Sequence, residues 1–133
     1  MATGLENLKI YQMAKALELR IHTITEVFPF EEKYRSIDQL KRSSASVSNN
    51  IAESYYKNSL KEKIYILRNQ VITENEETRS NILRCADKGF LDQNVAELIS
   101  EDYMQLRKAT YGYIKFLRDK FTKLDNSLNS STH

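Results

Sequence analysis

Apolar residues recur along this chain at alternating steps of three and four, the spacing that lines one face of an α-helix. The first stripe lies within residues 5–28 and stops before Pro29, because proline lacks a backbone donor and disfavours helix at the residue before it. Its members are Ile10, Ala14, Leu17, Ile21, Ile24 and Phe28. This pattern predicts a long first helix followed by a short connection.

Two more stripes follow between residues 37 and 89. The earlier one has small hydroxyl residues at some inward positions, which lets helices approach closely; it consists of Ile37, Leu40, Ser44, Val47, Ile51 and Ser54. The next helix is expected to begin after Ser59, a capping residue with Glu62 in the capping-box position, and to end near Gly89. Its stripe consists of Leu60, Ile64, Leu67, Val71, Glu74 and Thr78.

A fourth helix is expected after Asp92, a residue type that caps helix N-termini. Its stripe consists of Ile99, Tyr103, Leu106, Thr110, Tyr113, Leu117 and Leu124. Four such helices joined by short turns predict an all-α fold, an antiparallel up-down four-helix bundle. We assign residues 1–125 to this single domain and the Ser/Asn-rich residues 126–133 to a flexible polar C-terminal tail.

Composition agrees with one helical domain. The chain has 133 residues, enough for one core, and its three Gly and one Pro are too few for a turn-rich sandwich or barrel. No stretch approaches the roughly 20 apolar residues that span a bilayer, and the N-terminus lacks a signal-peptide pattern. We therefore expect a cytoplasmic protein, and the lone Cys85 agrees with a reducing compartment.

The third helix carries a hint of oligomerisation. Tyr65 and Ile72 lie seven residues apart on a line separate from the main stripe. A helix that is apolar on two sides of a small protein usually has a neighbour from another subunit. We therefore expect Tyr65 and Ile72 to contribute to a contact between copies of the chain.

No residue set suits catalysis. Bundle proteins with paired metals use Glu-x-x-His motifs, but no Glu stands three residues before His22, the only histidine within the predicted fold. His22 reads as a partly exposed helix residue and Cys85 as a small apolar filler. The three Gly are isolated, so no phosphate-cradling loop is predicted. We expect no enzyme activity, no metal and no cofactor.

Charge is distributed unevenly along the chain. Residues 41–70 carry a net +4, residues 71–102 carry −5 and residues 103–133 carry +4. Basic residues recur at spacings that place them on common helix faces, and such rows bind phosphate backbones. The predicted nucleic-acid-binding residues are Lys41, Arg42, Lys57, Lys61, Arg68, Lys108, Lys115 and Arg118. Nearby tyrosines are suited to stacking on unpaired bases, namely Tyr55, Tyr56, Tyr65 and Tyr111. The alternative interpretation of these rows is a solvated helix surface.

The stretch from Gln39 to Ser54 contains Gln-Leu, the basic pair Lys41 and Arg42, small residues and then Asn-Ile-Ala-Glu ending at Glu53. It resembles the signature of a bacterial four-helix-bundle family that is encoded within intervening sequences of 23S ribosomal RNA genes and is sometimes labelled a ribosomal protein. Phe28-Pro29, Ser59 with Lys61-Glu62, and Gly89-Phe90-Leu91 match in order and spacing. The likeness covers roughly residues 8–120.

The resemblance implies a subunit of a ring-like homopentamer without known catalytic activity. A protein similar in fold, the accessory variability determinant of diversity-generating retroelements, uses a basic surface to engage nucleic acid and a reverse transcriptase. Lys41, Arg42 and Lys61 are the strongest matched basic residues, and Arg79 is a further match.

Two functions from different classes follow. The first is an oligomeric nucleic-acid-binding protein, RNA being the expected ligand, with a ribosome or ribosomal RNA association. The second is a scaffold that binds a protein partner and no nucleic acid. Asn49, Asn50 and Glu53 have a structural interpretation in either case, as interhelical hydrogen bonds or subunit contacts at a close helix crossing.

Overall fold

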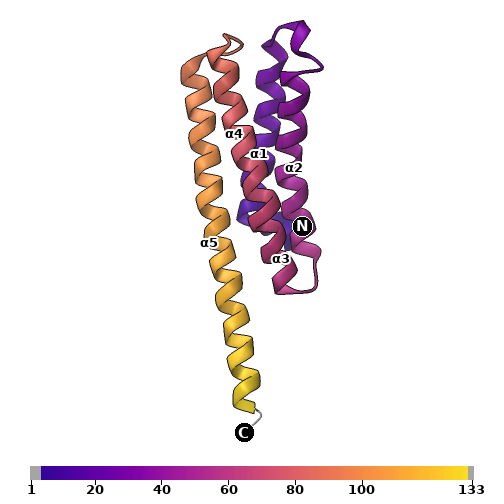
Figure 1. Cartoon of the computed structure of the whole chain (residues 1–133), viewed down its shortest axis with the longest axis vertical. Helices are drawn as coiled ribbons and strands as arrows, with labels where there is room; N and C mark the ends of the chain where they lie inside the picture. The colour runs from indigo at the N-terminus through magenta and orange to yellow at the C-terminus, as the bar shows by residue number, and fades with distance from the viewer. Residues whose placement is uncertain (1–3, 132–133) are drawn as a thin grey trace.

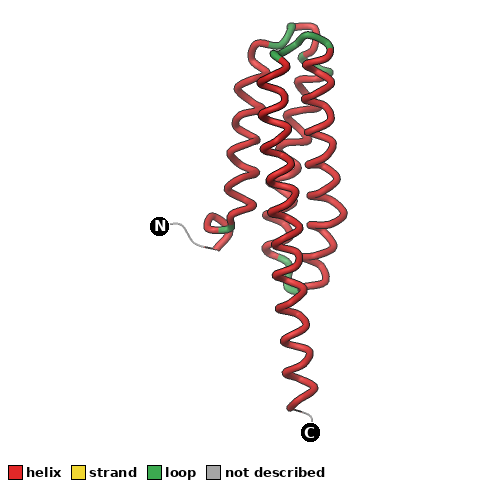
Figure 2. The backbone as a smooth tube through the Cα atoms, turned by 90° about the vertical axis from the view of Figure 1, so that its left-hand side faces the viewer, coloured by secondary structure: helices red, strands yellow, loops and turns green. Residues whose placement is uncertain are grey.

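The computed structural model describes residues 4–131, with side chains described for residues 4–120 and 122–123, and this part of the chain is all-α without a strand. Four long helices make up the molecule (Figures 1 and 2). The third of them is built from α3, η4 and α4 in direct succession. The α-helices are α1 (Lys9–Ile24), α2 (Ser36–Tyr56), α3 (Leu60–Ile66), α4 (Ile72–Asp87) and α5 (Gln93–Ser131), and the shorter elements are η1 (Gly4–Asn7), η2 (Thr25–Val27), η3 (Phe30–Glu32) and the π-helical η4 (Leu67–Val71).

The connections between successive long helices alternate between the two ends of the molecule (Figure 1). One end carries the α1–α2 and α4–α5 connections, and the other carries the α2–α3 turn. The last turns of α5 project beyond the α2–α3 turn without a neighbouring helix (Figures 1 and 2). None of the described helices combines the length and apolarity that crossing a bilayer requires.

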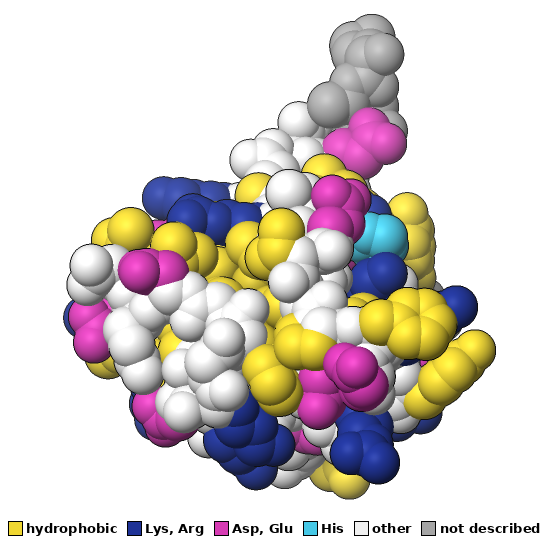
Figure 3. All heavy atoms as spheres, turned by 90° about the horizontal axis from the view of Figure 1, so that it is seen from above, with side chains coloured by type: hydrophobic (Ala, Val, Ile, Leu, Met, Phe, Trp, Pro, Cys, Tyr) yellow, Lys and Arg dark blue, Asp and Glu magenta, His cyan; other side chains and the backbone are white. Residues whose placement is uncertain are grey.

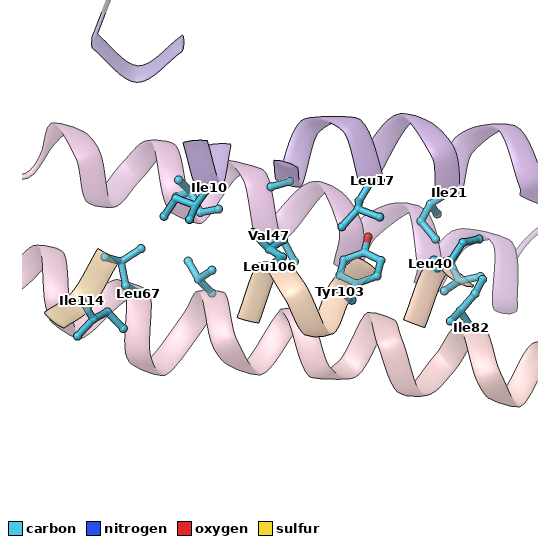
Figure 4. Packing of buried hydrophobic residues seen from close by; sticks show 14 of the residues in the cluster. Ile10, Leu17, Ile21, Leu40, Val47, Leu67, Ile82, Tyr103, Leu106 and Ile114 are labelled. Atoms are coloured by element: carbon cyan, nitrogen blue, oxygen red, sulfur yellow. The ribbon is translucent and has the colours of Figure 1, made fainter. Parts of the chain in front are cut away.

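Side chains from all four long helices meet in one core (Figure 4). The predicted stripe of the first helix is buried as expected at Ile10, Ala14, Leu17 and Ile21. The α-helical part of this segment is shorter than predicted, because its first and last turns are the 3-10 helices η1 and η2. Helix α5 is longer than predicted, since its backbone is helical to Ser131, within the segment that we assigned to a tail. Residues 132–133 of that segment lie outside the described residues, and its expected flexibility stays a prediction.

Capping residues set the helix boundaries where the sequence predicts them. The Ser59 side chain accepts a hydrogen bond from the Glu62 backbone N–H at 3.0 Å, and the Asp92 carboxylate accepts one from Asn94 N–H at 2.8 Å. After α4, Gly89 adopts φ +82°, a conformation that glycine reaches without steric cost. The Phe90 N–H then donates back to the Cys85 carbonyl at 3.0 Å, which closes the end of α4. These contacts confirm the predicted helix starts after Ser59 and Asp92 and the predicted end near Gly89.

The faces of the third helix, which the π-helical segment η4 interrupts, differ from the prediction at two places. The predicted stripe is buried on both sides of η4's end, at Leu67, Val71 and Thr78. Our assignment of Glu74 to this stripe is wrong: Glu74 is half-buried, and its neighbour Asn75, only 1% exposed, takes the inward place between Val71 and Thr78. The two residues that we placed on a second face also differ, since Tyr65 is 63% exposed and Ile72 only 8%. Ile72 is thus covered within one chain, and of this pair only Tyr65 is open to a partner.

Candidate nucleic-acid interface

Two basic segments of the sequence meet at the end of the molecule that carries the α2–α3 turn, because the middle of α5 passes beside this turn (Figure 1). We call this region the basic end. In residues 53–63 and 115–123 together, seven basic residues face only three acids, Glu53, Glu62 and Asp119. The seven are Lys57, Lys61, Lys63, Lys115, Arg118, Lys120 and Lys123. Two segments that are separate in the sequence thus contribute to one positively charged region.

An open cavity of about 460 Å³ lies within the basic end, between the last turn of α2 and the third helix. We call it the α2–α3 cavity. It is lined by Glu53, Lys57, Lys61, Glu62, Tyr65, Ile66 and Gln70. This cavity therefore brings together two predicted phosphate-binding cations, Lys57 and Lys61, and one predicted stacking ring, Tyr65.

Some cations of the basic end already have a partner, and others do not. The Lys57 Nζ lies 3.9 Å from a Glu53 carboxylate oxygen, and the Lys115 Nζ lies 3.7 Å from an oxygen of Asp119. Both pairs are exposed, so each contributes little to stability and is readily exchanged for another anion. Within the part of the chain that the structure describes, no ion pair is found for four further cations, namely Lys61, Arg118, Lys120 and Lys123. These four are the cations most available to a phosphate backbone.

Lys63 has a different role, which the sequence analysis missed. Its ammonium group donates hydrogen bonds to the backbone carbonyls of Ser54 at 3.3 Å and Tyr55 at 2.5 Å, at the end of α2. A cation is favourable at a helix C-terminus because the last carbonyls carry partial negative charge. Partial burial lowers the pKa of Lys63, and the nearby Lys120 lowers it further. Lys63 thus fastens the α2–α3 turn and positions Lys57 and Lys61, which flank this turn.

Aromatic side chains border the cations. Tyr56, Tyr65 and Phe116 are 71%, 63% and 57% exposed. Tyr56 meets the Tyr55 ring edge-on at 5.2 Å between centroids, which restrains both rings. Exposed rings beside lysines are the usual surface on which unpaired bases stack.

Other predicted cations lie away from the basic end or are engaged within the chain. Arg42 pairs with Asp38 at 3.3 Å and borders a separate cavity of about 330 Å³ between α2 and α4, into which Glu74 and Glu77 also face. Burial raises the pKa of Glu74, and so does the neighbouring Glu77 carboxylate. Lys41, the sequence neighbour of Arg42, does not line this cavity. Acidic groups thus surround Arg42, which makes this cavity a poor phosphate site.

Arg79 is held between α4 and α5. Its Nε donates to Glu76 at 2.7 Å, and its Nη1 lies 3.4 Å from the Ser100 hydroxyl. Arg107 also binds Glu76, at 2.9 Å. Arg79 therefore contributes to helix packing. Arg68 and Lys108 are exposed, on η4 and α5 respectively.

The Asn-Ile-Ala-Glu motif makes contacts that differ from our expectation. Asn50 donates to the backbone carbonyl of Ser46 at 2.8 Å and to its hydroxyl at 2.9 Å, within α2. Glu53 pairs with Lys57, the residue directly after α2, and Asn49 is exposed. The hydrogen bonds and the ion pair found for Asn50 and Glu53 in the described part of the chain are local, so none of them runs between helices. The predicted role of the motif residues in subunit contacts stays a prediction.

Polar contacts between helices come instead from small and hydroxyl residues. Ser48 on α2 donates to Glu18 on α1 at 2.5 Å, and Thr78 on α4 donates to the Ser43 hydroxyl on α2 at 2.8 Å. The amide of Asn75 donates to the backbone carbonyl of Tyr103 at 3.1 Å. The small inward residues of α2 thus allow close approach, as the sequence predicts, and also supply hydrogen bonds between helices.

The opposite end of the molecule has a mixed surface. Acidic, basic and hydrophobic side chains are interspersed there (Figure 3). Val27, Phe30 and Tyr34, all near the α1–α2 connection, are 77%, 81% and 83% exposed. The Lys33 ammonium group lies 6.0 Å from the Phe30 ring centroid and 5.4 Å from that of Tyr34. This end therefore presents exposed apolar side chains among charges of both signs and lacks the one-sided charge of the basic end.

The two residues considered for catalysis lie apart from these surfaces. Cys85 is buried, and burial raises the pKa of its thiol, while His22 is exposed. Across residues 4–131, no group of three or more His, Cys, Asp and Glu side chains is placed to hold a metal ion.

The sequence matches a known protein family. The model of a family described as 23S rRNA-intervening sequence protein matches residues 6–112, which is most of the chain. No curated protein matches the sequence.

Proposed function

Because the chain belongs to the family of 23S rRNA-intervening sequence proteins, we propose that it is a non-enzymatic, cytoplasmic protein that binds RNA through its basic end, in association with ribosomal RNA or the ribosome. The observation that carries this proposal is the convergence of two basic segments, with seven cations against three acids, around the α2–α3 turn. Exposed rings at Tyr56 and Tyr65 add stacking surfaces. The family's name supports ribosomal RNA as the first ligand to test.

We further propose that the subunit is an antiparallel up-down bundle and that five copies form a ring. Repeated copies of a weak site on one scaffold raise the effective concentration of binding groups without any new contact. One chain has a mass of 15.6 kDa, so the pentamer has a mass of about 78 kDa. Light scattering on a sizing column measures this mass, and a value near that of one chain would exclude the ring.

Binding is tested by electrophoretic mobility shift with ribosomal RNA fragments and with DNA, across a series of salt concentrations. Affinity is expected to fall steeply as salt rises, because phosphate contacts release condensed counterions. Charge reversal at Lys61 and Arg118 is expected to abolish the shift. Binding that is insensitive to salt would exclude the phosphate-contact mechanism.

A protein-binding scaffold is the second candidate, and the exposed apolar surface opposite the basic end favours it. Phe30 and Tyr34 are each more than four-fifths exposed, and contiguous exposed apolar groups usually mark an interaction site. Under this alternative, a Phe30→Ser/Tyr34→Ser variant loses its protein partner, while charge reversal at Lys61 and Arg118 leaves partner capture intact. Absence of any RNA or DNA shift in the wild-type protein would favour the scaffold.

A further inference from the structure

The α2–α3 cavity lies directly against the π-helical segment η4. Gln70, which belongs to η4, lines the cavity, and so does Ile66, the residue immediately before it. π-helical turns inside α-helices are frequently found at functional sites, because they re-aim side chains at the expense of regular hydrogen bonding. Here the π-helical turn brings Gln70 to the same cavity as Tyr65, five residues earlier. One wall of the cavity is thus formed by a π-helical turn and the residue before it.

We infer that the α2–α3 cavity binds one unpaired nucleotide of a single-stranded nucleic acid, an inference that rests on the proposed RNA-binding function. Its volume of about 460 Å³ falls within the range of small-ligand sites. Tyr65 offers an exposed aromatic ring, and Ile66, 5% exposed, supplies an apolar floor beside it. A base inserted between these side chains stacks on Tyr65 and covers Ile66.

The phosphate of this nucleotide is held by lysines on both walls. Lys61 lies on α3, and no ion pair is found for it in the described part of the chain. Lys57 comes from the end of α2, and its 3.9 Å pair with Glu53 is weak enough to open toward a phosphate. The phosphate therefore lies between Lys57 and Lys61, and the base lies against Tyr65 and Ile66.

The remaining polar groups suit the hydrogen-bonding edge of a base. The Glu53 carboxylate accepts hydrogen bonds only, whereas the Gln70 amide both donates and accepts. Cytosine, adenine and guanine offer an exocyclic amino group to Glu53, whereas uracil offers only its ring N3–H as a donor. In a duplex this edge is paired and the base faces are stacked, so only an unpaired nucleotide fits. The cavity thus prefers single strands, and it prefers bases with an exocyclic amino group over uracil.

Fluorescence anisotropy with labelled short oligocytidylate, oligouridylate and a duplex RNA of equal length tests the inference. The variant Tyr65→Ala is expected to weaken oligocytidylate binding about tenfold, the effect of losing one stacked base, and to leave duplex binding unchanged. Tyr65→Phe keeps the ring and is expected to bind like the wild type. Tyr34→Ala, which removes a similarly exposed tyrosine at the opposite end, is the matched control.

A second variant tests the base edge. Glu53→Gln adds a donor at the cavity wall and is expected to reduce the preference for oligocytidylate over oligouridylate. If Tyr65→Ala has no effect, or weakens duplex and single-strand binding equally, the proposed nucleotide site is wrong. The proposed RNA-binding function still holds in that case, provided that charge reversal at Lys61 and Arg118 abolishes binding. If the wild-type protein binds none of these RNAs, both proposals are wrong.

Discussion

Neutralising Lys61 is the most direct perturbation of the basic end. This residue lies on exposed α3 surface, so replacing it with Gln removes one charge and leaves the packing unchanged. Four cations of the basic end have no ion pair within the described part of the chain, namely Lys61, Arg118, Lys120 and Lys123. If each neutralises one phosphate of a single strand, log affinity falls against log salt with a slope of about −2.8. The variant Lys61→Gln leaves three such contacts and a slope of about −2.1.

The predicted difference is large enough to measure. Between about 50 mM and 200 mM salt, four contacts imply an affinity loss of about 50-fold and three contacts a loss of about 20-fold. If several copies of the chain engage one RNA, both slopes increase together and their ratio is preserved. Anisotropy titrations with one labelled RNA at four or more salt concentrations determine each slope.

A second variant with the same change in net charge distinguishes the effect of the position of Lys61 from the effect of net charge on the slope. Lys88 is an exposed lysine at the end of α4, at the opposite end of the molecule. Lys88→Gln changes the net charge by the same amount as Lys61→Gln and is expected to leave the slope at its wild-type value. An unchanged slope in Lys61→Gln, or an equal decrease in Lys88→Gln, would refute the assignment of phosphate contacts to the basic end.

Three further predictions concern stability, each measured by thermal or chemical unfolding. The Tyr103 hydroxyl is buried without a hydrogen-bond partner among the described residues. Tyr103→Phe is therefore expected to raise the free energy of unfolding by about 1 kcal/mol. A decrease in this free energy would mean that the hydroxyl is hydrogen-bonded. Burial and the neighbouring Glu77 raise the pKa of Glu74, so its ionisation weakens the folded state as pH rises through the pKa of the folded protein. Glu74→Gln is therefore expected to raise the Tm at pH 7 and to change it little at pH 4, and an equal gain at both values would exclude a protonation effect. Ser59 caps α3 by accepting a hydrogen bond from the Glu62 N–H. Ser59→Ala is therefore expected to lower the free energy of unfolding by about 1 kcal/mol, and Ser59→Asp, which keeps a capping oxygen, is expected to lower it less. Equal losses in the two variants would argue against capping.

Helix boundaries and most of the core follow from residue order. Ser59, Asp92 and Gly89 act through local hydrogen bonds and backbone conformation, so their effects are readable without knowledge of distant contacts. The inward stripe of the first helix is equally local, because an α-helix repeats every 3.6 residues wherever it packs. These features predicted four helices around one core, and the structure agrees.

The stripe of the third helix was predicted correctly past Val71 except at Glu74. A step of three or of four after Val71 fits an α-helix equally well, and both lead on to Thr78, which is buried. The structure takes the step of four, so Asn75 is buried and donates to the Tyr103 carbonyl, while Glu74 lines the cavity between α2 and α4. Spacing along one helix cannot decide between these two steps, and it did not predict the π-helical turn η4.

In the candidate site, too, some features follow from the local sequence and others only from the packing of the helices. Each of its cations is visible as a basic residue in the sequence, and the spacing of three between Lys115 and Arg118 places these two on one face of a helix. Spacing within one helix cannot show that α5 passes beside the α2–α3 turn, which brings Lys120 near Lys63. Nor can it show that Arg79 faces Ser100 on α5, or that Arg107 of α5 binds the same Glu76 carboxylate as Arg79. Residue order therefore suffices for the helices and the inventory of charges, because both are local. Packing of the four helices decides which charges meet at the basic end and which neutralise one another, because those distances depend on segments far apart in the chain.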